Sequence, residues 1–285
     1  MASDPHIKAI VKLMEACRYR HDLYTVFSDC ISCMALAISN AVDFAQSKAR
    51  EARYLEIVGR YDQDVIDAFP KVLAEVTMAL EAGPGDVLGA VFGALELHNT
   101  ARGQFFTPFE VCRMMARMQI GDGAEARAIV ERQGFVTACE PACGAGALII
   151  ALAEAMQNAG INYQRHLHVT AVDVDARAAH MAYVQFSLLH IPAVVIVGNA
   201  LTLEEREHWF TPAHVIGGWN TRLAARERRE VAASPAIAVP TCEEGGGVAA
   251  PAAPAAPSSG RRAIERTPRT AARSPDRATH AVLAR

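Results

Sequence analysis

The 285-residue sequence has little lysine, no paired prolines and no long uninterrupted apolar run. Lysine occurs four times against 24 arginines, and the net charge is −3, which excludes a molecule that holds DNA over its whole surface. Any surface for nucleic acid must therefore be local. No apolar run reaches the roughly 18 residues that a membrane span needs, so we expect no membrane segment.

Secretion signals and metal-binding patterns are missing as well. Asp4, His6 and Lys8 interrupt the start of the chain, and the seven cysteines follow no secreted-scaffold spacing, so we expect a cytoplasmic protein with free thiols. Cys30 and Cys33 form a lone CxxC pair with no second pair at a zinc-like spacing, and the histidines lack paired ligand spacing. We predict no metal site. The sequence also contains no Gly-x-Ser-x-Gly elbow, so a Ser-His-Asp hydrolase is unsupported.

Three regions of the chain differ in composition and periodicity. Residues 1–101 carry helical patterns with almost no strand signal, and Asp22 and Asp86 are expected helix starts, so we predict a helical N-terminal domain. Residues 102–223 alternate β-branched apolar runs with helical stretches, which predicts an α/β core with a parallel sheet. Residues 224–285 are rich in Ala, Pro and Arg with few large apolar side chains, and we expect them to be disordered.

Within the predicted core, the order of elements is strand, helix, strand, helix, strand, strand. The expected strands are 135–139, 168–174, 193–198 and 214–219, and the expected helices are 147–159 and 176–190.

Two phrases in the chain indicate a ligand site. They read Gly-Gln-Phe-Phe-Thr-Pro at 103–108 and Glu-Pro-Ala-Cys-Gly-Ala-Gly at 140–146, and the second lies between a predicted strand and a predicted helix. Gly144 and Gly146 lack Cβ atoms, so backbone can approach a ligand closely and the helix can start beside it. A strand, a glycine-rich turn and a helix in this order are typical of cofactor-binding α/β folds.

Each of these features also has a purely structural interpretation. Thr107 and Pro108 are a good N-cap pair for a helix that starts near Phe109. A glycine turn alone is weak evidence, because other nucleotide-binding folds contain it. Asp173 and Asp175 follow a buried apolar run, and they could simply solvate and cap the end of that strand.

The two phrases, the acidic strand end and Gly-Asn-Ala-Leu at 198–201 follow one another in an order that resembles the N6-adenine DNA methylase family. The likeness is greatest to the modification subunits of type I restriction systems, and it covers about a third of the chain. It implies a Rossmann-like methyltransferase core after a helical domain, with S-adenosylmethionine as cofactor and DNA as substrate. The implied cofactor site consists of Phe106, Thr107, Pro108, Glu140, Pro141, Ala142, Gly144, Gly146, Asp173 and Asn199.

The resemblance also assigns roles within that site. Asp173 would accept hydrogen bonds from the ribose hydroxyls, and Asp175 would start the next helix. Asn199 would lie near the adenine ring of the cofactor, at a position where the family more often has Asp. The Phe-Thr-Pro phrase at 106–108 would fold over the cofactor.

The chain departs from the family at the catalytic motif. Adenine N6 is a poor nucleophile, so these enzymes flip the base out, stack it on an aromatic ring and accept its N6 hydrogens with an (Asn/Asp/Ser)-Pro-Pro-(Tyr/Phe) motif. This chain has no Pro-Pro and reads Gly217-Gly218-Trp219-Asn220 at the expected place. Trp219 could stack a base and Asn220 could accept a hydrogen bond, which makes them the candidate catalytic residues. The favoured alternative is a glycine turn followed by a packed tryptophan.

The predicted sheet is also smaller than a complete methyltransferase sheet. Only four strands are predicted before Ala224, and the fourth would be an open hydrophobic edge, which proteins normally cover. Three explanations stay open: a partner subunit completes the fold, the N-terminal helices cover the edge, or the chain is a truncated remnant.

Three functions stay open as well. The first is methylation of adenine N6 in DNA in a restriction–modification setting. The second is an inactive module that binds S-adenosylmethionine and acts through a partner, which the missing Pro-Pro favours. The third, methylation of RNA or protein, explains the missing motif but not the Gly-Gln-Phe-Phe-Thr-Pro phrase.

Overall fold

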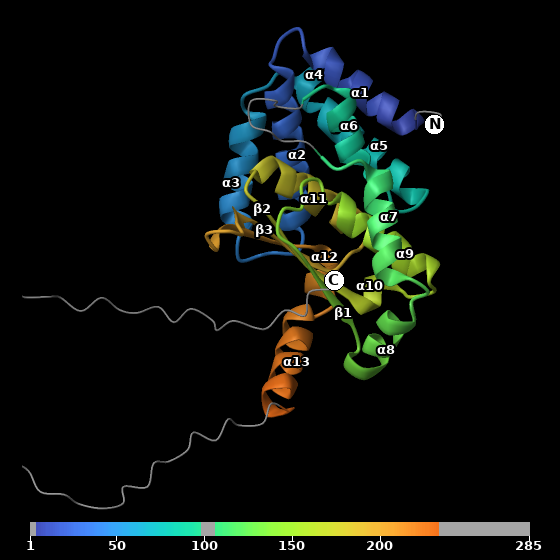
Figure 1. Ribbon diagram of the computed structural model, residues 1–285. Coiled ribbons are helices and arrows are strands. Elements are labelled where there is room, and N and C mark those ends of the chain that lie inside the picture. The colour runs from blue at the N-terminus through green and yellow to red at the C-terminus, as the bar shows by residue number, and fades with distance from the viewer. Residues whose placement is uncertain (1–3, 98–105, 234–285) are drawn as a thin grey trace, which may run out of the picture. The chain divides into compact units, whose positions relative to one another are not determined.

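The computed structural model describes residues 4–97 and 106–233, and its described residues as far as Arg226 form one compact unit. The first part of the chain is helical (Figure 1): α1 Pro5–Cys17, α2 Leu23–Asn40, α3 Ser47–Val58, α4 Gln63–Ile66, α5 Ala68–Glu81 and α6 Val87–Ala94. Helices then alternate with strands: α7 Phe109–Ile120, α8 Ala124–Gln133, β1 Val136–Glu140, α9 Ala147–Asn158, α10 Tyr163–His166, β2 Leu167–Asp173, α11 Ala176–Leu188, β3 Ala193–Asn199, β4 Glu204–Phe210, α12 Pro212–Ile216 and α13 Trp219–Ala233.

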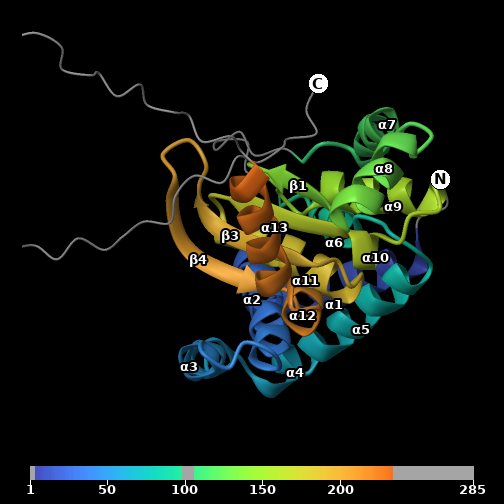
Figure 2. The same ribbon diagram turned by 90° about the horizontal axis from the view of Figure 1, so that it is seen from below.

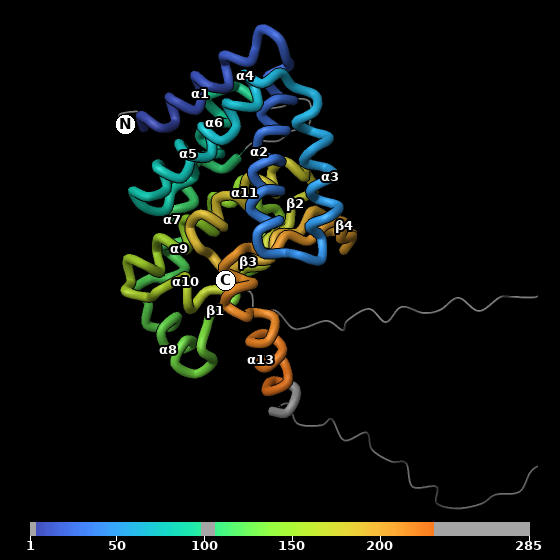
Figure 3. Tube along the Cα trace, turned by 180° about the vertical axis from the view of Figure 1, so that it is seen from behind, coloured from blue at the N-terminus to red at the C-terminus, as the bar shows by residue number. Residues whose placement is uncertain are grey.

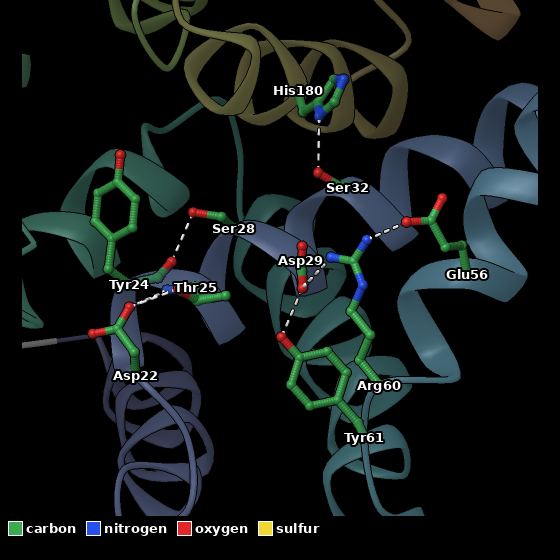
Figure 4. Close-up of polar contacts among 10 residues, drawn as sticks. All are labelled: Asp22, Tyr24, Thr25, Ser28, Asp29, Ser32, Glu56, Arg60, Tyr61 and His180. Carbon is green, nitrogen blue, oxygen red and sulfur yellow. Dashed lines mark hydrogen bonds and ion pairs between the residues drawn. The ribbon is translucent and has the colours of Figure 1, made fainter.

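Aspartate side chains start two of the N-terminal helices, as the sequence predicts. Asp22 accepts a hydrogen bond of 2.8 Å from the Thr25 amide at the start of α2 (Figure 4). Asp86 accepts one of 2.9 Å from the Gly89 amide at the start of α6. Each carboxylate satisfies an amide that has no partner within its own helix.

The sheet has the order β1-β2-β3-β4, with β1, β2 and β3 parallel. Helices α9 and α11 form the two crossovers between the parallel strands, and α11 packs on β2 and β3. The predicted Rossmann-like α/β fold is confirmed, together with the first three strands and both crossover helices. Figure 2 shows β1 at one edge of the sheet and β4 at the other.

The predicted fourth strand at 214–219 is wrong. Those residues lie in α12, in the turn after it and at the start of α13. Helix α12 forms because Thr211 caps it at the His214 amide and Pro212 occupies its first turn. The fourth strand is instead β4, which runs antiparallel to β3. It contains no apolar run, since most of its side chains are charged and exposed, and this is why the sequence pattern did not reveal it.

N-terminal helices lie against the sheet region, as Figures 1 and 3 show. Helix α2 packs on α11, and Ser32 of α2 contacts His180 of α11 at 3.1 Å between Oγ and Nδ1 (Figure 4). From α3, Arg50 donates to the backbone oxygen of His208 in β4 at 2.7 Å. The fourth strand is therefore a charged edge with a helix beside it, and not the hydrophobic edge that we expected.

Helix α2 is, among the described helices, the one long and apolar enough by length and composition to cross a membrane. In the folded protein 61% of that stretch is buried, and the core helix of a folded domain has the same character. The expected lack of a membrane segment stays a prediction.

The expected boundary between 223 and 224 falls inside helix α13. Residues 224–233 are helical and not disordered, while 234–285 lie outside the described residues. The expected boundary between 101 and 102 also lies outside them, so the division into two domains stays a prediction.

Candidate functional site

A pocket of about 790 Å³ opens at the carboxyl ends of β1 and β2. Its volume lies within the range of small-molecule sites, and its place follows the rule that open parallel sheets bind ligands beyond their carboxyl ends. The residues that line it are Asp86, Phe106, Thr107, Cys112, Met115, Glu140, Ala142, Cys143, Gly144, Ala145, Ala147, Leu148, Asp173, Val174, Asp175 and Ala176.

The glycine turn between β1 and α9 forms one wall of the pocket. Gly144 and Gly146 have φ angles of 54° and 94°, in the left-handed region that favours glycine. A Cβ atom at Gly146 would overlap the ring of Phe186, and one at Gly144 would lie 3.0 Å from Phe106. Both glycines are therefore required by the backbone and by close packing.

Asp173 ends β2 and holds the same turn in place. Its Oδ2 accepts from the Gly144 amide at 2.8 Å, and its Oδ1 accepts from the Asp175 amide at 2.9 Å. Burial raises the pKa of Asp173, and these backbone hydrogen bonds oppose the rise. Each carboxylate oxygen can accept a second hydrogen bond, so Asp173 can hold the turn and also receive a ligand hydroxyl.

Glu140 adds a second carboxylate at the end of the neighbouring strand. Burial raises the pKa of Glu140, the Ala142 amide opposes the rise, and the charge of Asp173 adds to it. Asp175 lines the pocket too, and it caps α11 at the Arg177 amide as the sequence predicts. Among the described lining residues there are four acids and no lysine or arginine, so the pocket favours a cationic ligand.

The Phe-Thr-Pro phrase lies partly over the turn. Phe106 lines the pocket, packs against Phe92 with ring centroids 5.0 Å apart and closes over Gly144. Thr107 is exposed and also lines the pocket, but it does not cap α7: the residue before that helix is Pro108, and no side chain caps it. The expectation of a threonine cap is wrong. Gln104 and Phe105 lie outside the described residues.

Four predicted cofactor residues do not line the pocket: Pro108, Pro141, Gly146 and Asn199. Gly146 acts through the shape of the turn. Asn199 is bound to its own loop, since its Oδ1 accepts from the amides of Leu201 at 3.0 Å and Thr202 at 3.4 Å. The other six predicted residues, Phe106, Thr107, Glu140, Ala142, Gly144 and Asp173, lie together around the pocket.

Sequence reasoning missed the pocket residues that come from the helices. Asp86 at the start of α6 was recognised only as a helix cap, and Cys112 and Met115 of α7 carry no ligand signal. The helical periodicity of α7 predicts that residues three apart share a face, but not which face meets a cavity.

The candidate catalytic residues lie at the other end of the strands. Trp219 is 1% exposed and packs on Phe135, just before β1, and on His168 near the start of β2, with ring centroids 5.0 and 5.2 Å away. Asn220 Oδ1 lies 2.9 Å from His214 Nε2. The structure does not bring either residue to the pocket, and both are engaged in packing and hydrogen bonding.

Within the described part of the chain, no group of three or more His, Cys, Asp or Glu side chains is placed to hold a metal ion. Cys30 and Cys33 are buried in α2, and burial raises the pKa of Cys33 to about 12, which makes it a poor nucleophile.

Comparison with known proteins gives two matches. The family model for N-6 DNA methylases matches residues 85–227, half of the chain. A solved structure of a class I S-adenosylmethionine-dependent methyltransferase from Listeria monocytogenes aligns with 69% of this chain and 54% of its own, at 12% identity and a TM-score of 0.38. This chain thus spans about half the length of that protein, and a likeness so distant supports no conclusion. No curated protein matches the sequence.

Proposed function

The chain belongs to the N-6 DNA methylase family, and we propose that its pocket binds S-adenosylmethionine for methyl transfer to adenine N6 in DNA. The setting is that of the modification subunit of a restriction system. The single observation that supports the cofactor best is the acidic pocket at the carboxyl ends of β1 and β2, which lies within the matched residues.

The charges of the pocket suit this cofactor. S-adenosylmethionine carries a sulfonium, an ammonium and one carboxylate, so it is a net cation. Asp86, Glu140, Asp173 and Asp175 face the cavity, and their negative charge complements that cation. Binding a cation beside Asp173 and Glu140 also relieves the unfavourable burial of their charges, which is the cause of their raised pKa values.

Particular residues would bind particular parts of the cofactor. Asp173 accepts hydrogen bonds from the ribose hydroxyls, because it ends the second strand and its carboxylate keeps acceptor capacity beyond its backbone partners. The turn at Gly144 brings backbone to the methionine end, and Phe106 covers it. When bound, the cofactor supplies an electrophilic methyl group.

The residues that hold the target adenine come, in this proposal, from outside the described part of the chain. The flipped base needs an aromatic surface and an acceptor for its N6 hydrogens beside the methyl group. Trp219 and Asn220 are at the opposite end of the sheet. We assign the base-binding role to a partner subunit that joins at this sheet.

The sheet offers such a partner an edge and a face. Strand β1 is the first strand of the sheet, and Cys139 of β1 is exposed although it belongs to a parallel pair. Thr170 and Val172 of β2 are half-buried, and the register places Thr170 beside Cys139 on the same face. Parallel sheets are normally covered on both faces, so a partner with a strand and apolar helices fits here.

Calorimetric titration of S-adenosylmethionine into the wild type and into Asp173→Asn tests the cofactor assignment. We expect one site per chain and an affinity loss of about 100-fold in the variant, since hydrogen bonds to a charged group are worth about 1.5–3 kcal/mol each. Asp22→Asn, which changes a helix cap outside the pocket, is the control and should bind normally. A folded wild-type chain that binds no cofactor contradicts the proposal.

A methylation assay tests the substrate. Unmodified DNA is incubated with methyl-labelled S-adenosylmethionine and the nucleosides are separated. We expect labelled N6-methyladenine from the complex purified from its native cells and none from the isolated chain. Label in 5-methylcytosine, RNA or protein contradicts the adenine assignment, while N6-methyladenine made by the isolated chain contradicts the need for a partner.

A further inference from the structure

Among the described lining residues, Asp86 is the one acid that comes from the N-terminal helices. It precedes α6, and its Oδ1 accepts from the Gly89 amide at 2.9 Å and from Gln185 Nε2 at 3.0 Å. Asp86 also lines the cavity, together with Gly144 and Ala145 of the glycine turn. A helix cap in water has no need of a second donor or of a place in a cavity wall, so capping alone does not account for this position.

Gln185 ties Asp86 to the turn. Its side chain is fully buried in α11, and its Nε2 donates both to Asp86 and to the backbone oxygen of Ala145, the latter at 2.8 Å. Its Oε1 accepts from the Leu88 amide at 3.0 Å. A single amide therefore fixes the start of α6, the Asp86 carboxylate and the glycine turn relative to one another.

Gly89 leaves the space that the carboxylate occupies. A Cβ atom at Gly89 would overlap the carboxylate of Asp86, although α6 itself would be more stable with alanine there. We infer that glycine is present here to leave room for Asp86, since glycine inside a helix is otherwise destabilising. Gln185 and Gly89 thus hold one carboxylate at the wall of the pocket.

We propose that Asp86 binds the ammonium group of the cofactor's methionine end, with Gln185 and Gly89 as its positioning residues. The proposal rests on the proposed cofactor, whose ribose lies at Asp173, at the end of β2. The methionine end then lies at the glycine turn, which is where Gln185 holds Asp86. No lysine or arginine among the described lining residues competes for this carboxylate.

The electrostatic state of Asp86 agrees with a cationic ligand. Burial raises the pKa of Asp86, and the hydrogen bonds from Gln185 and Gly89 only partly oppose the rise. A carboxylate in this state gains more from a bound ammonium than an exposed carboxylate would, since water screens the interaction less.

Calorimetry with two ligands tests the assignment. S-adenosylmethionine and S-adenosylhomocysteine share the ammonium group, but only the first has a sulfonium. For Asp86→Asn we expect about a tenfold or greater loss of affinity for both ligands. An equal loss supports the ammonium contact, whereas a loss for S-adenosylmethionine alone overturns it in favour of the sulfonium.

Two further variants separate binding from folding. Gly89→Ala should change the melting temperature little, since the helix propensity gained with alanine offsets the cap hydrogen bond that is lost. It should still weaken the binding of both ligands, because the new methyl group displaces the carboxylate. Asp22→Asn is the matched control: it makes the same charge-removing change at the cap of α2, where Asp22 accepts from the third amide of the helix, and it should leave both affinities unchanged.

The outcomes also separate this proposal from the cofactor assignment itself. In one outcome the wild type binds both ligands and Asp173→Asn binds them more weakly, while Asp86→Asn and Gly89→Ala bind them with wild-type affinity. In that case Asp86 is only a helix cap and this proposal is wrong. If the wild type binds neither ligand, the cofactor assignment fails first.

Discussion

The two ends of the parallel strands differ in whether their polar and aromatic side chains border an open space. At the carboxyl ends of β1 and β2, Glu140 and Asp173 face a cavity of about 790 Å³, and burial raises the pKa of each. At the amino ends, Trp219 and His168 are almost completely buried and packed against each other. An aromatic ring next to a polar side chain is therefore no sign of a catalytic site unless it borders an open space.

Hydrogen bonds at the amino end link His168, His214 and Asn220 in a row. Asn220 Oδ1 can only accept, so His214 donates to it from Nε2 and accepts at Nδ1 from His168 Nε2, at 2.9 Å for each contact. Both histidines are neutral in this arrangement, and burial lowers the pKa of His168 to about 3. The carboxyl end keeps hydrogen-bond acceptors available for a ligand, whereas these acceptors at the amino end are bound by side chains of the protein itself.

The largest effect that we expect is the loss of the amino-end packing. Trp219→Ala should lower the free energy of unfolding by about 3–5 kcal/mol, as for other fully buried large side chains, and change the affinity for S-adenosylmethionine less than twofold. Urea denaturation and calorimetry measure the two quantities. A stable Trp219→Ala protein that binds the cofactor but no longer methylates DNA with its partner would restore the catalytic assignment of Trp219.

The second effect that we expect is a loss of folding stability in acid. Burial lowers the pKa of His168 and of His180 to about 3, so the unfolded chain binds protons that the folded chain does not. The unfolding free energy should fall by about 2 kcal/mol per histidine between pH 7 and pH 5. The raised pKa values of Asp173 and Glu140 act in the other direction, because they favour the folded state at low pH and that contribution is lost as pH rises.

Urea denaturation at pH 7 and at pH 5 checks the direction of this change in unfolding free energy. His180→Gln removes one of these histidines and should make the fall in unfolding free energy between pH 7 and pH 5 smaller by about 2 kcal/mol. Stability that rises from pH 7 to pH 5 in the wild type would show that the pocket acids, and not the buried histidines, dominate.

A smaller effect is expected from the glycine turn. Gly144→Ala should lower the free energy of unfolding by about 1 kcal/mol because of the positive φ at this residue. It should also lower the affinity for the cofactor about tenfold, because the turn and Phe106 must shift. Gly134→Ala is the matched control: Gly134 has a φ of 89° at the end of α8, with nothing within 4 Å of a new Cβ atom. Equal loss of binding in both variants would contradict a role of the turn in the pocket.

The smallest effect concerns Asn199. Asn199→Asp restores the residue that the family more often has, yet we expect the affinity to change less than about threefold, because Asn199 binds its own loop and does not line the pocket. A gain of more than tenfold in the same calorimetric titration would place the adenine ring of the cofactor beside this residue.

The sequence predicted those parts of the fold that depend on local pattern. Strands β1, β2 and β3 come from mostly apolar runs of sequence, and the glycine turn has a specific motif, so both were recognised. Strand β4 was missed because an exposed edge strand needs no apolar side chains on its outer surface. Asp86 was missed as a pocket residue because its contact with Gln185 joins positions far apart in the chain, which no local pattern encodes.

A crystal structure of the chain with S-adenosylmethionine tests the central claim most directly. We predict density for the ligand in the pocket between Glu140 and Asp173, with the ribose at Asp173, and an unchanged arrangement around Trp219. Ligand bound at the amino ends of the strands, or an empty pocket at saturating ligand, would contradict the account.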